Sequence, residues 1–137
     1  MKPREDPEVQ AWLAKAAEDL AAARILAQHA PYLDTVVGFH CQQAVEKSLK
    51  AALVVADVDP PKTHDLDVLL ARLLQLMPVL SAMQEAASYL NGYSVVPRYP
   101  AFQPHSDDRE SRSHRAMTLA SDAVELITQA LAPGETA

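Results

Sequence analysis

FHCQQAVEKSLKAAL, residues 39–53, carries an apolar arc and a polar arc at helical spacing. At about 100° per residue, the side chains of such a segment divide between two faces of one helix. The apolar face includes Val37, Cys41, Ala44, Val45, Ser48, Leu49, Ala51, Ala52 and Val55. The polar face holds Phe39, His40, Gln42, Gln43, Glu46, Lys47 and Lys50. This pattern predicts a long helix over about residues 34–56, with one face in a core.

The segments on either side of this helix show the same period. Further helices are expected over about residues 7–30, 64–77, 79–90 and 107–131. Thr63 and Ser106 are the expected N-caps of the helices over 64–77 and 107–131. Asn91 and Gly92 are expected to stop the helix over 79–90, with Gly92 at positive φ. The sequence therefore predicts an all-α protein, an antiparallel bundle of four or five helices. One domain covers residues 1–137, with a core over about 8–131 and a frayed tail.

The bulk composition restricts the class of protein. Lys and Arg number 12 against 18 Asp and Glu, so the net charge is −6 and binding of nucleic acid over the whole surface is excluded. This composition does not exclude a local basic cleft. The only cysteine, Cys41, cannot form an intrachain disulfide, and its place on the apolar face predicts an inert core thiol. The start of the chain lacks a signal-peptide pattern and no apolar run reaches membrane length, so a soluble cytoplasmic protein is expected.

Motifs for metals and cofactors are absent from the sequence. There is no Cys-x-x-Cys or His-Glu-x-x-His pattern, so no metal site is expected. There is no P-loop or glycine-rich dinucleotide turn, and we expect no cofactor. A phosphate site in this chain would have to use Arg, Lys, His and helix N-termini.

The polar face of residues 39–53 allows two interpretations. One is a solvated surface, on which Glu46 and Lys50 form an i,i+4 pair that stabilises the helix by roughly a few tenths of a kcal/mol. The other is the wall of a cleft or of a dimer seam. Phe39 favours the second interpretation, because an exposed aromatic ring within a polar face needs a partner or a ligand.

The stretch PRYPAFQPHSDDRESRSH, residues 97–114, gathers arginines and histidines beside prolines. One interpretation is a solvated loop and helix start, whose arginines pair with Asp107, Asp108 or Glu110. The other is a phosphate site, because guanidinium binds phosphate oxygens in a fixed fork and imidazole transfers protons near neutral pH.

In order along the chain, AEDLAAARIL, VGFHCQQAVEKSLKAAL, KTHDLDVLLARL and RYP resemble the HEPN domain (higher eukaryotes and prokaryotes nucleotide-binding). The resemblance covers about residues 8–131. It implies a four- or five-helix antiparallel bundle that commonly dimerises. Many members are encoded beside a minimal nucleotidyltransferase as a toxin–antitoxin pair. Active members are metal-independent ribonucleases with an Arg-x(4–6)-His motif near the last helices, and two copies of it face one cleft in the dimer.

The resemblance implies two candidate catalytic pairs in this chain. Arg98 and His105, separated by six residues, are the first choice because they lie with RYP before the last helix. Arg109 and His114, separated by four, are the second choice, although on one helix they would lie about 140° apart. The residues implied to line the nucleotide or phosphate cleft are Phe39, Gln43, Glu46, Lys47, Lys50 and Tyr99.

The expected function is therefore metal-independent RNA cleavage, by one half of a toxin–antitoxin-like pair with a minimal nucleotidyltransferase. We expect a homodimer with RNA or a nucleotide as ligand. The alternative is a non-catalytic helical module that binds a nucleotide or docks on a partner protein. A purely structural helical dimer is a third alternative.

Overall fold

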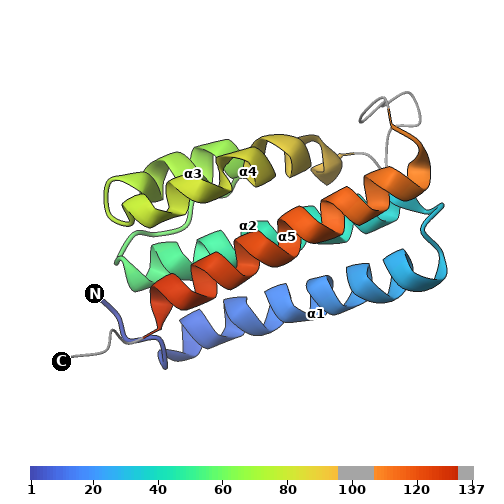
Figure 1. Ribbon diagram of the computed structural model, residues 1–137. Coiled ribbons are helices and arrows are strands. Elements are labelled where there is room, and N and C mark those ends of the chain that lie inside the picture. The colour runs from blue at the N-terminus through green and yellow to red at the C-terminus, as the bar shows by residue number, and fades with distance from the viewer. Residues whose placement is uncertain (96–106, 133–137) are drawn as a thin grey trace.

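The fold was analysed in a computed structural model that describes residues 1–95 and 107–132. Every regular element in these two ranges is helical, so the predicted all-α fold is confirmed (Figure 1). The elements are α1 (Pro7–His29), α2 (Asp34–Val55), α3 (Leu66–Leu74), the 3₁₀ helix η1 (Pro78–Met83), α4 (Gln84–Leu90), the 3₁₀ helix η2 (Asn91–Ser94) and α5 (Arg109–Leu131).

The helix α2 is the centre of the bundle. It packs along α1 and α5, and the shorter α3 and α4 lie on its other side (Figure 1). Sixteen of its 22 residues are buried, including Gln42, Glu46 and Lys50 from the expected polar face. The solvated interpretation is therefore wrong for these three residues, since neighbouring helices cover side chains that the polarity pattern assigned to solvent.

The N-caps of α3 and α5 are aspartates, not the predicted Thr63 and Ser106. Asp65 Oδ1 accepts hydrogen bonds from two backbone N–H groups in the first turn of α3, at 3.0 and 3.2 Å. Thr63 Oγ1 instead accepts from the N–H of Asp65 at 3.1 Å. Asp108 caps α5, and Ser106 lies outside the described residues. A carboxylate accepts the same hydrogen bonds as a hydroxyl and also suits the helix dipole, which favours aspartate here.

Two turns also differ from expectation. Gly92 does not take a positive φ, because the chain continues into η2 instead of stopping at Asn91. Positive φ occurs at Asp57, just beyond α2, with φ of 60°. There the N–H groups of Asp57 and Val58 donate to the carbonyls of Val54 and Leu53, at 3.0 and 2.9 Å. These two bonds form a Schellman motif that ends α2.

Tyr93 fastens η2 to the first turns of α2. Its ring lies so close to the backbone of Gly38 that a Cβ at this position would collide with the ring. Tyr93 is only 1% exposed, although its sequence neighbours Gly92 and Ser94 are half-buried. A glycine is required at residue 38 for this close approach.

Candidate functional site

The first-choice catalytic residues, Arg98 and His105, lie outside the described residues, and so does Tyr99. The described residues on either side of them are Val95, which follows η2, and Asp107, which precedes α5. Tyr93 ties η2 to the first turns of α2 through Gly38. The N-terminus of α5 lies at the same end of the bundle as the start of α2 (Figure 1). The assignment of Arg98 and His105 as catalytic residues stays a prediction.

The second-choice pair, Arg109 and His114, is not brought together within this chain. Arg109 Nε lies 3.9 Å from Asp34 Oδ1, whereas His114 Nε2 lies 3.7 Å from Glu110 Oε1. Both basic side chains are largely exposed, on different sides of α5. This agrees with the angular separation expected for residues five apart on a helix.

A buried ion pair holds the start of α5 against the start of α2. Arg112 Nε donates to Asp34 Oδ2 at 2.8 Å, and the two side chains are 15% and 5% exposed. The hydrogen bond to Asp34 raises the pKa of Arg112, since it favours the charged guanidinium. Arg115 pairs with Glu85 at 2.8 Å and lies over the ring of Tyr89. Arg112 and Arg115 of α5 therefore pair with carboxylates of α2 and α4. The interpretation as a solvated helix start expected them to pair with Asp107, Asp108 or Glu110.

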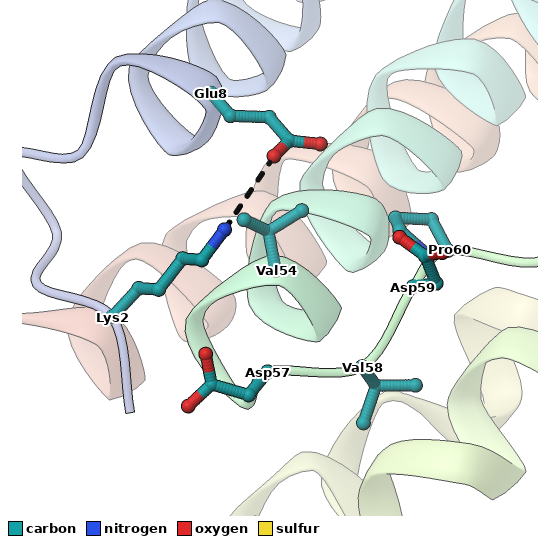
Figure 2. A pocket seen from close by; sticks show the side chains of 7 residues that line it. All are labelled: Lys2, Glu8, Val54, Asp57, Val58, Asp59 and Pro60. Carbon is teal, nitrogen blue, oxygen red and sulfur yellow. Dashed lines mark ion pairs between the residues drawn. The ribbon is translucent and has the colours of Figure 1, made fainter.

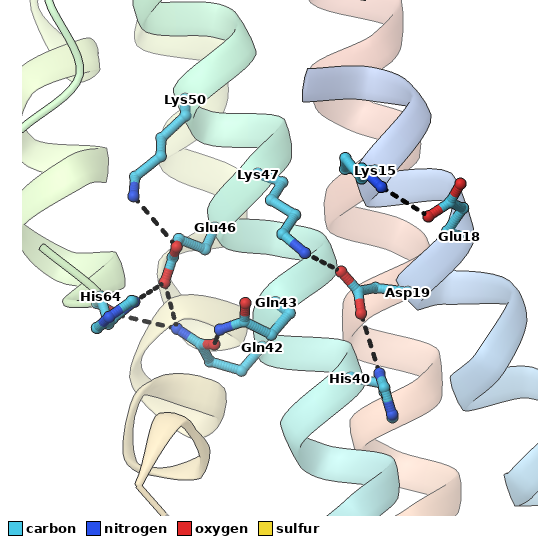
Figure 3. Close-up of polar contacts among 10 residues, drawn as sticks. All are labelled: Lys15, Glu18, Asp19, His40, Gln42, Gln43, Glu46, Lys47, Lys50 and His64. Atoms are coloured by element: carbon cyan, nitrogen blue, oxygen red, sulfur yellow. Dashed lines mark hydrogen bonds and ion pairs between the residues drawn. The ribbon is translucent and has the colours of Figure 1, made fainter. Parts of the chain in front are cut away.

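Asp19 of α1 joins two basic side chains of α2 (Figure 3). Its Oδ1 lies 2.9 Å from His40 Nδ1, and its Oδ2 accepts a hydrogen bond from Lys47 Nζ at 2.5 Å. The Asp19 side chain is 13% exposed. The ring of Phe39 meets His40 edge-on, with 5.5 Å between the ring centroids. The charge of Lys47 is therefore already matched by a carboxylate of the same chain.

Glu46 collects three donors on the other side of α2 (Figure 3). Its Oε1 lies 2.8 Å from His64 Nδ1 and accepts from Gln42 Nε2 at 3.3 Å, and its Oε2 accepts from Lys50 Nζ at 3.2 Å. Lys50 Nζ also lies 5.5 Å from the centre of the Trp12 ring. These contacts explain how charged side chains are buried here, since each charge is paired and hydrogen-bonded.

The residues expected to line the cleft therefore fall into two groups. Phe39, Gln43 and Lys47, spaced four residues apart, are half-buried along one line of α2. Glu46 and Lys50 lie beneath the surface as an ion pair whose side chains are 4% and 10% exposed. A phosphate group would have to displace Glu46 to reach Lys50 and Asp19 to reach Lys47, whereas Phe39 and Gln43 are partly accessible to a ligand.

Sequence reasoning missed His64, Asp19 and Asp34 as parts of these clusters. His64 belongs to the KTHDL stretch, and its side chain is 73% exposed although its Nδ1 is held by buried Glu46. It lines an open pocket of about 380 Å³ with Thr63, Asp65, Asn91, Gly92, Ser94 and Val95. A histidine directly before an N-cap aspartate was visible in the sequence, but its carboxylate partner lies 18 residues earlier.

Three further findings concern metal ligands, the thiol of Cys41 and the length of the apolar helices. No group of three or more His, Cys, Asp or Glu residues within 1–95 and 107–132 is arranged to hold a metal ion. Burial raises the pKa of Cys41 to about 12, which agrees with the predicted inert thiol. In the same ranges, no helix combines the length and apolar character needed to span a bilayer.

A second pocket, of about 320 Å³, lies near the N-terminus of the chain (Figure 2). Its charged residues are Lys2, Glu8, Asp57 and Asp59, and Lys2 already pairs with Glu8 at 3.8 Å. The surplus of carboxylates makes this pocket a poor site for a phosphate.

The HEPN domain family matches residues 9–131 of the chain. The chain belongs to the HEPN domain family. Its fold is similar to that of TT1696 from Thermus thermophilus, known from a crystal structure, with a TM-score of 0.73 and 24% sequence identity. The alignment covers 89% of this HEPN domain and 97% of TT1696. No curated protein matches the chain.

Proposed function

We propose that this HEPN domain is a metal-independent RNA endonuclease that uses Arg98 and His105. The observation that carries the proposal is the spacing of this arginine and histidine, with six residues between them, in a chain whose HEPN match covers residues 9–131. The separation of Arg109 from His114 supports the choice of the first pair over the second.

The chemistry follows from the two side-chain types. The ribose 2′-oxygen attacks the adjacent phosphorus as its proton passes to a base, and the bond from phosphorus to the 5′-oxygen breaks as that oxygen gains a proton. The imidazole of His105 takes part in one of these two proton transfers. The guanidinium of Arg98 stabilises the charge on the phosphoryl oxygens. The products are a 2′,3′-cyclic phosphate and a 5′-hydroxyl.

The elements η2 and α5, which flank residues 96–106 in the sequence, are both anchored to α2, and this supports the proposal. Tyr93 packs on Gly38 before the segment, and Arg112 pairs with buried Asp34 after it. Both anchors use the first turns of α2, which also carry Phe39. Phe39 and Gln43 are half-buried and give RNA a ring for base stacking and an amide for hydrogen bonds.

The test is RNA cleavage by the purified protein in EDTA, comparing wild type with Arg98→Ala and His105→Ala. Loss of a proton-transfer group reduces the rate about 10²–10⁴-fold, and loss of a charge-stabilising donor about 10²–10³-fold. We expect His105→Ala and Arg98→Ala to lose cleavage to these extents. Arg24→Ala and His29→Ala are matched controls, since both residues are exposed on α1. Arg109→Ala and His114→Ala test the second pair.

Three results would contradict the proposal: wild type that does not cleave, cleavage abolished by EDTA, or full activity in both Arg98→Ala and His105→Ala. Circular dichroism on every variant excludes loss of folding as the cause of inactivity. If only Arg109→Ala and His114→Ala lose activity, the second pair, contributed by two subunits, would replace the first.

We further propose that the active form is a cytoplasmic homodimer, controlled by a minimal nucleotidyltransferase as in a toxin–antitoxin pair. The net charge of −6 supports docking on a basic partner surface. If wild type fails to cleave RNA, the same acidic charge favours a non-catalytic module that binds the nucleotidyltransferase or a nucleotide. Titration calorimetry with ATP tests the nucleotide form of this alternative, and no heat at millimolar ATP would contradict it.

A further inference from the structure

The loop before α3 holds an exposed histidine against a buried carboxylate. His64 Nδ1 lies 2.8 Å from Glu46 Oε1, and the two side chains are 73% and 4% exposed. Gln42 Nε2 donates to the backbone carbonyl of His64 at 2.9 Å, so the main chain is fixed as well (Figure 3). One edge of the imidazole is therefore fixed, while most of the side chain faces solvent.

This contact determines which ring nitrogen carries the proton. An ionised carboxylate only accepts hydrogen bonds, so the proton of the neutral ring lies on Nδ1. Glu46 Oε2 lies 3.2 Å from Lys50 Nζ, so the carboxylate is held between the imidazole and an ammonium group. Nε2 then carries the lone pair, and it has no hydrogen-bond partner within residues 1–95 and 107–132. Glu46 therefore holds the Nδ1 edge of the ring and leaves the Nε2 edge open to a ligand.

The adjoining pocket suits a hydroxyl group. His64 lines it with Asp65, whose Oδ1 accepts three N–H donors, from Asp67, Val68 and Asn91. No donor within the described ranges reaches Asp65 Oδ2, which can accept a hydrogen bond from a ligand. Carboxylates bind ribose hydroxyls in this way.

We propose that His64 is the general base that takes the proton from the ribose 2′-hydroxyl, and that Glu46 is its positioning residue. This assignment rests on the ribonuclease function proposed above. The 2′-oxygen forms its bond to phosphorus as its proton moves to His64 Nε2. The bond to the 5′-oxygen breaks, and that oxygen takes its proton from a separate acid, a role this assignment leaves to His105.

The test compares two RNA substrates that differ in one atom. One has the natural 5′-oxygen leaving group, and the other has a 5′-bridging sulfur, which leaves without help from an acid. A base is needed for both substrates, so His64→Gln should cleave both about 10²–10⁴-fold more slowly than wild type. His105→Gln should be slow on the oxygen substrate and recover on the sulfur substrate. His29→Gln, an exposed histidine on α1, is the matched control.

Glu46→Gln gives a second measurement, because glutamine can still accept a hydrogen bond from His64 Nδ1 but carries no charge. We expect kcat to fall on both substrates while KM is unchanged. A purely structural role for the Glu46–His64 contact would lower the thermal midpoint without this selective loss of kcat.

The outcomes separate this assignment from the function on which it rests. Wild-type rates in His64→Gln, with activity lost in Arg98→Ala, would overturn the role of His64 alone. Recovery of His64→Gln on the sulfur substrate would make His64 the acid and would also overturn it. Inactive wild type on both substrates would overturn the ribonuclease function and this assignment together. Circular dichroism of His64→Gln checks folding, which should persist because the side chain is mostly exposed.

Discussion

Gly38 shows how one residue can fix the position of another element. The ring of Tyr93 lies against its backbone, and a side chain at residue 38 would occupy the space of that ring. Gly38→Ala should therefore lower the free energy of unfolding by about 1–3 kcal/mol, the usual effect of overpacking a core. Urea unfolding measures this change.

Gly92→Ala is the matched control for that substitution. Gly92 has no positive φ and lines an open pocket. A change of less than about 0.5 kcal/mol is expected, as for substitutions that disturb no packing. Equal effects at the two glycines would contradict the role given to Tyr93.

Burial of Cys41 makes the free energy of unfolding depend on pH in the alkaline range. Burial raises its pKa from 9.0 to about 12, so between these values the folded state holds a proton that the unfolded state has lost. The contribution is complete below pH 9 and is lost as the pH rises toward 12. Between pH 8 and 10, wild type should lose stability more steeply than Cys41→Ala, by at most about 1.4 kcal/mol per pH unit. Parallel urea titrations at each pH test this, and equal slopes would show that the thiol does not contribute.

At the residue scale, the sequence predicted the buried apolar side chains more reliably than the buried polar side chains. Cys41 lies on the apolar face and is fully buried as predicted. Gln42 and Glu46 were placed with the polar residues, yet they are buried too. Their burial depends on donors from other elements, His64 among them, and helical periodicity carries no information about such contacts.

Among the elements, the ion pair between Asp34 and Arg112 holds α2 and α5 together at one end. Asp34→Ala would leave a partly buried guanidinium without its carboxylate, which costs about 3–5 kcal/mol in buried pairs. We expect a loss toward the lower end of this range, because Arg112 Nη1 also donates to the carbonyl of Asp107. Arg112→Leu in the Asp34→Ala background should recover part of the loss.

A double-mutant cycle with Asp34→Ala and Arg112→Leu measures the coupling by urea unfolding. Glu85→Ala serves as the exposed counterpart, because the Glu85 and Arg115 side chains are 68% and 48% exposed. It should cost less than about 1 kcal/mol. Additive effects of the two substitutions in the cycle would contradict the assigned pairing.

The long helices could be predicted closely, and the short ones could not. The predicted ranges 7–30 and 34–56 differ from α1 and α2 by one residue each, because long apolar stripes average over many positions. The range 79–90 is divided into η1 and α4, and the two predicted caps were wrong. Helices this short depend on tertiary contacts, such as the bond from Leu66 N–H to Asn91 Oδ1 at 2.8 Å.

For the whole molecule, family resemblance predicted the architecture but not the polar clusters. The bundle follows from the HEPN match over residues 9–131. The clusters depend on contacts between distant residues, such as Asp19 with Lys47 and Glu46 with His64. The sequence alone does not show which acidic and basic residues pair, since each carboxylate has several possible basic partners.

These clusters also connect the helices into one cooperative unit. Trp12 of α1 lies beside Lys50, which pairs with Glu46, and Glu46 contacts His64 before α3. Trp12 is the only tryptophan, so its fluorescence reports on the junction of three elements. A single domain of this size unfolds in one transition when its elements share one core. We expect the fluorescence and far-ultraviolet circular dichroism transitions in urea to have the same midpoint. A fluorescence transition at lower urea would mean that α1 separates from α2 before the other helices unfold.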